Sequence, residues 1–231
     1  MFVGGVRALL LQSLHPLAMA GVAQHSGFKG DPWGRLQRTS HFLAVTTFGT
    51  SADADAMVAR IRAVHETVRG TAPDGRAYAA SDPHLLRWVH IAEIDSFLAA
   101  HQRFGHQPLD AAGRDGYVAD TARVAEALGV LAPPRSEAEL REQMSSYQDE
   151  LVGTPEAREA ARFILLTPPL PLLARAPYAA IASAAVSLLP VPARRQLRLP
   201  VLPITEAAVI RPVGKGITRT IRWAMAPPAG S

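Results

Sequence analysis

The stretch that decides the fold runs from Ser81 to Gly105 and reads SDPHLLRWVHIAEIDSFLAAHQRFG. Asp82 followed by Pro83 is a typical helix start, because aspartate caps free N–H groups and proline fits the first turn. Apolar residues then recur at helical spacing, and glycine is the usual residue just beyond a helix end. The stretch therefore predicts one long helix that ends at Phe104.

The segments around this stretch carry similar helix signals. Apolar residues at 6–23 predict a first helix, which Pro16 kinks or breaks. A second helix is predicted from the Asp31-Pro32 pair to about Phe48, with Gly49 closing it, and a third from a Ser51 cap to Gly70. Further signals predict a turn at 73–75, a helix at 117–128, and a capping box at 136–139 that opens the next helix.

These signals predict an all-α fold, a multi-helix bundle forming a single domain over 1–231. No stretch shows the apolar–polar alternation of a half-buried strand. Hydrophobic residues make up 48% and charged residues 19%, a composition that excludes disorder. The C-terminal part, 163–231, is expected to be helical and punctuated by prolines.

Composition also excludes several functions. Without cysteine, the chain has no disulfides, thiolate metal sites, iron–sulfur clusters or cysteine nucleophiles. The net charge of +4 comes from scattered arginines, so we expect no nucleic-acid partner. The HExxH, GxGxxG, GxxxxGK[ST] and GxSxG motifs are absent, which argues against the enzymes that they mark.

Two apolar segments bear on location. The N-terminal one imitates a secretory signal, but polar residues and proline at 12–16 interrupt its apolar core early. Prolines divide the segment 163–192 into pieces shorter than the ~20 residues of a spanning helix. We therefore expect a cytoplasmic protein, and peripheral contact with a membrane stays open.

The histidines are unevenly distributed. His65 has Ile61 and Val68 at helical spacing, and His90 has similar apolar neighbours, so both rings are expected to point inward. An inward imidazole can bind haem iron, but a hydrogen-bonded core histidine is the more frequent case, and a non-haem metal site built from several histidines is a third reading. All eight lie in the first 106 residues: His15, His25, His41, His65, His84, His90, His101 and His106.

Arg35 and Thr39 are four residues apart, and Arg38 adjoins Thr39, so these side chains are expected on one side of a helix. Such a cluster suits a buried anion, including the propionates of a haem, because arginine binds carboxylates through two hydrogen bonds. The alternative is a helix face paired with Asp31 or Asp53.

Several ordered motifs together resemble the catalytic domain of the MpaB and rubber-oxygenase (latex-clearing protein) family, in the form of its short bacterial members. The resemblance covers most of the chain and is strongest within 5–105. It implies a helical fold, a buried pocket for b-type haem, and oxygenase activity with O2. The motifs are RALLLQSLHP at 7–16, DPWGRLQRT at 31–39, RAVHETVRG at 62–70 and DPHLLRWVH at 82–90.

The resemblance assigns roles to particular residues. His65 is similar to the iron ligand of rubber oxygenases, so it is the predicted metal ligand. Arg35 and Thr39 match the haem-pocket helix. Arg38 stands where rubber oxygenases have a lysine above the iron, and arginine cannot release its proton as lysine can. His90, in the sequence Trp-Val-His, is a second candidate for the iron or for a distal catalytic role, together with Arg38.

One family feature is missing. Rubber oxygenases use an acid upstream of the arginine equivalent to Arg35, whereas the first glutamate here is Glu66. Rubber cleavage is therefore not expected. Because Met1 stands only a few residues before the first motif, it stays open whether a short N-terminal helix of the relatives is missing.

The resulting hypothesis is a haem b oxygenase that acts with O2 on a small apolar substrate, isoprenoid or lipid-like. A helical haem- or lipid-binding protein without turnover, a non-haem histidine–metal oxidoreductase and a scaffold without cofactor are the alternatives.

Overall fold

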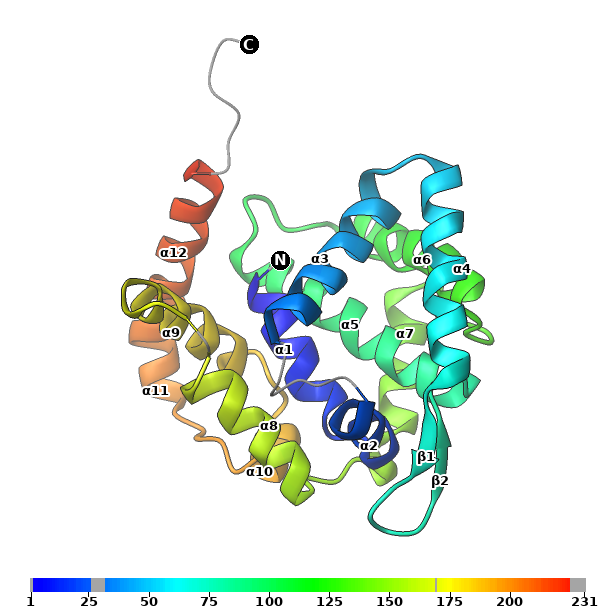
Figure 1. Ribbon diagram of the computed structural model, residues 1–231. Helices are drawn as coiled ribbons and strands as arrows, with labels where there is room; N and C mark the ends of the chain where they lie inside the picture. The colour runs from blue at the N-terminus through cyan, green and yellow to red at the C-terminus, as the bar shows by residue number, and fades with distance from the viewer. Residues whose placement is uncertain (1, 26–31, 169, 225–231) are drawn as a thin grey trace.

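The computed structural model describes residues 2–25, 32–168 and 170–224, with the backbone alone for 32–37, 39 and 40 (Figure 1). Its elements are helices throughout, apart from one short hairpin, so the all-α prediction is confirmed. In chain order they are α1 (Phe2–Gln12), α2 (Pro16–His25), α3 (Pro32–Phe48), α4 (Ser51–Thr67), β1 (Arg69–Thr71), β2 (Ala77–Ala79), α5 (Pro83–Phe104), α6 (Ala111–Leu128), α7 (Glu137–Ser146), η1 (Gln148–Glu150), α8 (Pro155–Leu166), α9 (Leu172–Ser187), α10 (Val191–Gln196), α11 (Pro203–Thr205), η2 (Glu206–Ile210) and α12 (Arg211–Ala224).

Helix α5 lies at the centre of the fold and packs along α1 (Figure 1). Its predicted start is confirmed, because the Asp82 carboxylate accepts a hydrogen bond from the backbone N–H of His84 and Pro83 occupies the first turn. The predicted end at Phe104, followed by Gly105, is confirmed too. The indole N–H of Trp88 donates to the carbonyl of Gln12 at 3.3 Å, which joins α5 to the end of α1.

The main hydrophobic core fills the space between α1, α5 and the helices around them. Leu10 and Leu14 of the N-terminal segment and Trp88 and Ile91 of α5 are fully buried. Burying such large side chains supplies most of the free energy that holds helices together. The core therefore fixes the position of α1 relative to α5, and with it the corner that follows α1.

The chain bends sharply between α1 and α2. Their axes differ by 106° across the break, and α2 begins at Pro16, as the proline predicted. His15 occupies this corner and is almost completely buried. No single described helix is long and apolar enough to cross a membrane; only the bent α1–α2 pair reaches that length and composition, and only when taken together.

The cap and the end predicted for the third helix both differ from those of α4. Its cap is Thr50 rather than Ser51, because the Thr50 hydroxyl accepts from the backbone N–H of Asp53 at 3.2 Å. The helix ends at Thr67 rather than at Gly70, because the chain there enters the hairpin β1–β2.

The hairpin β1–β2 explains why position 70 is occupied by glycine. Gly70 pairs with Tyr78, and a Cβ atom at position 70 would lie 2.7 Å from the Tyr78 hydroxyl oxygen. The predicted turn at 73–75 connects the two strands, with Gly75 at a φ of +87° that favours glycine. Strands of only three residues give no clear alternation, so the hairpin escaped the sequence analysis.

Two further predictions were partly right. The helix predicted at 117–128 begins earlier, at Ala111, where the Asp110 carboxylate caps it through the N–H of Gly113. The capping box at 136–139 is half present. Ser136 accepts from the N–H of Glu139, but the Glu139 carboxylate accepts from the N–H of Arg135 instead of Ser136.

Candidate functional site

The predicted haem-binding residues come from α3, α4 and α5. Helix α3 carries Arg35, Arg38 and Thr39 and packs against α4, which in turn packs on α6 (Figure 1). The side chains of Arg35 and Thr39 lie outside the described residues, so their predicted contacts stay predictions. The Arg38 side chain is exposed.

His65 lies in the last turn of α4 and is partly buried. Burial lowers its pKa below the ordinary value of 6.5, and the negative charge of Glu66 acts in the opposite direction. Its Nδ1 atom is buried and has no hydrogen-bond partner among the described residues. Burying a polar nitrogen without a partner is unfavourable, so this ring has capacity for a further interaction.

His90 lies in the middle of α5, and burial lowers its pKa more than that of His65. Burial lowers its pKa from 6.5 to about 4, so the ring is neutral at physiological pH. Its Nε2 atom is buried, and no described residue forms a hydrogen bond with it. A neutral imidazole with an unpaired nitrogen is the form that binds iron.

Glu93 is a candidate that the sequence analysis missed. It lies one helical turn after His90, on the same face of α5. Burial raises its pKa from 4.5 to about 7, and within the described part of the chain its carboxylate accepts no hydrogen bond. Burial also raises the pKa of Tyr117 on α6, with a contribution from the negative charges of Glu93 and Asp95.

A carboxyl group that titrates near neutral pH can hold or release a proton under working conditions. The only sequence signal for Glu93 was an acidic residue within the apolar run Ile91 to Ile94, one turn from a candidate histidine. The depth of its burial depends on the surrounding helices, and spacing along one helix does not reveal it.

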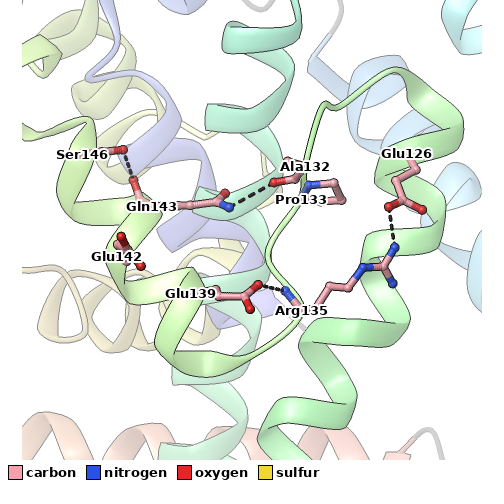
Figure 2. A pocket seen from close by; sticks show the side chains of 8 residues that line it. All are labelled: Glu126, Ala132, Pro133, Arg135, Glu139, Glu142, Gln143 and Ser146. Carbon is pink, nitrogen blue, oxygen red and sulfur yellow. Dashed lines mark hydrogen bonds and ion pairs between the residues drawn. The ribbon is translucent and has the colours of Figure 1, made fainter.

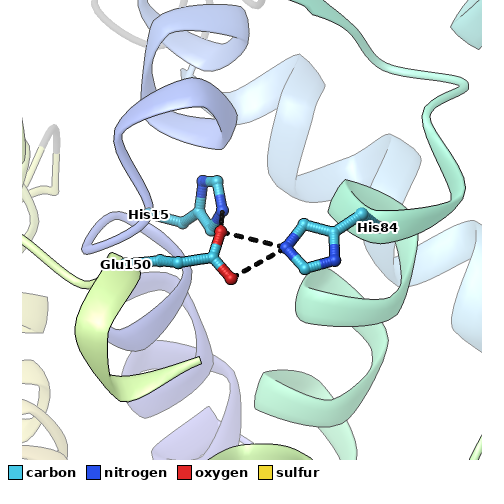
Figure 3. A group of neighbouring side chains, drawn as sticks. All are labelled: His15, His84 and Glu150. Atoms are coloured by element: carbon cyan, nitrogen blue, oxygen red, sulfur yellow. Dashed lines mark hydrogen bonds and ion pairs between the residues drawn. The ribbon is translucent and has the colours of Figure 1, made fainter. Parts of the chain in front are cut away.

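A second group of ionisable side chains includes neither His65 nor His90. It consists of His15 at the α1–α2 corner, His84 in the first turn of α5 and Glu150 at the end of η1 (Figure 3). His15 Nε2 lies 3.2 Å from Glu150 Oε2, and His84 Nε2 lies 2.9 Å from both oxygens of the same carboxylate. A metal site built from several histidines was one prediction from the sequence, but no sequence pattern connects His15 and His84 with Glu150.

Electrostatics couples the members of this second group. Burial lowers the pKa of His15, and the hydrogen bond and charge of Glu150 partly offset that effect. Burial alone would raise the pKa of Glu150, but hydrogen bonds and charge from His84 and His15 bring it below the ordinary value. The carboxylate is therefore ionised at neutral pH and available to a cation.

Two surface hollows were also described. One, of about 440 Å³, lies between α6 and α7, where Arg135 pairs with Glu126 (Figure 2). The other, of about 630 Å³, lies beside His101 and His106. Neither includes His65 or His90. The buried haem-type pocket stays a prediction, because the α3 side chains predicted to form one wall lie outside the described residues.

Comparison with known proteins places the chain in a family. The family model described as "ER-bound oxygenase mpaB/B'/Rubber oxygenase, catalytic domain" matches residues 1–223. An uncharacterized protein of Mycobacterium bovis and one of Mycobacterium tuberculosis are each 32% identical over 128 residues, which cover 55% of this chain and 47% of the relative. The chain spans about half the length of these curated relatives, and no solved structure matches it significantly. The chain therefore belongs to the mpaB and rubber-oxygenase catalytic-domain family.

Proposed function

We propose that this protein is a haem-dependent oxygenase that acts with O2 on an apolar substrate. The family supports the oxygenase class. The observation that carries the haem assignment is a pair of partly buried histidines, His65 on α4 and His90 on α5, each with a buried ring nitrogen that has no partner among the described residues. The single domain over 1–231 and the cytoplasmic location stay predictions.

The residues present fit a b-type haem. Burial favours the neutral form of both His65 and His90, which leaves a lone pair for iron. Following the family resemblance, His65 would be the iron ligand, His90 would be the second candidate for that role or a catalytic residue, and Arg35 and Thr39 would bind the propionates. When bound, the haem supplies the activation of dioxygen.

Two further side chains would contribute to the reaction, one by its positive charge and the other by proton exchange. Arg38 would supply a fixed positive charge. Glu93, with a pKa of about 7, can exchange a proton next to His90. We propose that it supplies the acid–base function for which no glutamate is present upstream of Arg35 in this sequence.

The substrate class rests on the family. The family includes rubber oxygenases, so an isoprenoid or lipid-like chain is the proposed substrate class here. Cleavage of rubber itself is not proposed, because the upstream acid is absent. The principal alternative is a haem- or lipid-binding protein without turnover, and oxygen consumption in the presence of a reductant and a prenyl substrate separates the two.

The first test is the visible absorption spectrum of the purified, haem-supplied protein, compared with His65→Ala and His90→Ala. His106→Ala, an exposed histidine outside this region, is the matched control. We expect a Soret band that only the His65 variant loses. Loss with His90→Ala alone would reverse the ligand assignment, and a missing band in every protein would refute the haem proposal.

A further inference from the structure

Three ligand-type side chains from distant parts of the sequence meet at one point (Figure 3). The nearest ring nitrogens of His15 and His84 and a carboxylate oxygen of Glu150 all lie within 4.8 Å of one another. The backbone also holds this point together, because the N–H of Val152, just after η1, donates to the carbonyl of Leu14 at 2.8 Å. The cluster is therefore part of the packed fold rather than a chance meeting of surface side chains.

Tyr147 sets the orientation of the His84 ring. The two rings stack with centroids 4.5 Å apart, and the Tyr147 hydroxyl oxygen lies 2.9 Å from the His84 carbonyl oxygen and 3.3 Å from His84 Nδ1. The hydroxyl donates to the carbonyl oxygen, and this bond together with the ring stacking restricts the orientation of the His84 ring.

This orientation directs His84 Nε2 at Glu150, at 2.9 Å from both carboxylate oxygens. The nitrogen can donate a hydrogen bond to the carboxylate or, in its unprotonated tautomer, bind a metal ion together with it. In metal sites, the nitrogen that does not bind the metal is commonly held by an oxygen atom, as Tyr147 holds His84.

His15 adds a second imidazole, whose orientation is fixed by the surrounding side chains. Its side chain is only 1% exposed, and it is packed beside the rings of Trp88 and Tyr147. By contrast, the side chains of His84 and Glu150 are 48% and 38% exposed. The cluster is thus rigid on its inner side and open to solvent on its outer side, where an ion can enter and keep water ligands.

We propose that His15, His84 and Glu150 bind a divalent transition-metal ion of the zinc class, at a site that includes neither His65 nor His90. Two imidazoles and one carboxylate suit such an ion, whereas calcium and magnesium prefer oxygen ligands. Metal bonds of about 2.0–2.2 Å place neighbouring ligand atoms of a tetrahedral site about 3.4 Å apart. The nitrogen–oxygen distances of 2.9 and 3.2 Å are close to that spacing, and all three ligand atoms lie within 4.8 Å of one another.

Such an ion joins the α1–α2 corner, the start of α5 and the segment η1. These segments are distant in sequence, since His15 and Glu150 are 135 residues apart. A ligand that binds only the folded state stabilises it by mass action. The bound ion is therefore expected to raise the unfolding temperature of the protein.

The test is a calorimetric titration of the full chain with Zn²⁺, after a chelator has removed bound metals. Co²⁺ in place of Zn²⁺ gives a visible absorption spectrum that reports nitrogen and oxygen ligands. We expect one equivalent bound, and an affinity at least about tenfold lower in His84→Ala and in Glu150→Gln. Both residues are well exposed, so the variants keep the fold, which circular dichroism verifies.

Two controls make the result specific. His106→Ala, another exposed histidine, and His65→Ala, in the proposed haem site, are both expected to bind Zn²⁺ as the unaltered chain does. Absence of binding, or an affinity unchanged in His84→Ala and Glu150→Gln, would overturn the metal site. An affinity lost in His65→Ala instead would assign the ion to the proposed haem site and overturn the inference equally.

Discussion

Replacing Glu93 with glutamine should change how the stability of the protein depends on pH. The pKa of Glu93 is 4.5 in an ordinary setting and about 7 in the folded protein, because burial disfavours the charged form. One pKa unit corresponds to 1.36 kcal/mol, so the ionised carboxylate destabilises the fold by about 3 kcal/mol once the pH exceeds both values. Glutamine has nearly the same shape and carries no charge at any pH.

The sign follows from proton counting. Between pH 4.5 and about 7, the folded state keeps the Glu93 proton and the unfolded state releases it. The contribution of Glu93 to the free energy of unfolding therefore falls as the pH rises through this window. His90 acts in the opposite direction, because its pKa is lowered to about 4 and its contribution is lost as the pH falls below 6.5. The two effects largely cancel where the windows overlap.

The assay therefore compares the free energy of unfolding of the unaltered protein with that of Glu93→Gln at each pH. Urea unfolding of the haem-free protein and of Glu93→Gln, monitored by circular dichroism from pH 4.5 to pH 8, gives the difference in free energy of unfolding at each pH. Because His90 is present in both proteins, its contribution cancels in this difference. We expect the advantage of the variant to grow with pH by about 3 kcal/mol.

Glu142→Gln is the matched control, since it makes the same chemical change at an exposed position. A difference for Glu93→Gln that is constant across the range, or that shrinks as the pH rises, would refute the buried, neutral carboxyl and with it the proposed acid–base role.

Three further substitutions test the fold through urea unfolding. Arg7→Leu removes a buried guanidinium that lies 2.7 Å from the Asp95 carboxylate, and should cost about 3 kcal/mol; a neutral result would mean that the pair adds no stability. Asp82→Ala removes the cap of α5 and should cost about 1 kcal/mol, an effect that Asp82→Asn should largely avoid. Gly153→Ala would place a Cβ atom 1.9 Å from the Gln196 carbonyl oxygen, so a loss of more than about 2 kcal/mol is expected, and tolerance would contradict this close approach.

The helices were largely predictable because their ends depend on local chemistry. Asp82 followed by Pro83, and the proline at position 16, correctly located a helix start and a chain break. The errors occurred where a distant contact decides the outcome. The stretch around Gly70 leaves the helix because it pairs with Tyr78 in a hairpin, and neither three-residue strand has a recognisable pattern alone.

The candidate site was predictable only in part. Helical spacing identified His65 and His90 as inward-facing candidates, and the family motifs predicted Arg35, Arg38 and Thr39 as further residues of the site. Glu93 was missed because a pKa near 7 depends on burial by other helices. The cluster of His15, His84 and Glu150 was missed because its members belong to three segments that only the packed core brings together.

The sequence by itself determined the helical class, the main helix boundaries and the family, because these depend on neighbours within a turn or on ordered motifs. The tertiary structure alone decided which ionisable groups lose contact with water and which distant side chains converge. Burial shifts the pKa of His90 and Glu93 in opposite directions, and the sharp bend at Pro16 carries His15 to Glu150. Both effects arise from packing between segments that are remote in the chain, and no local pattern encodes them.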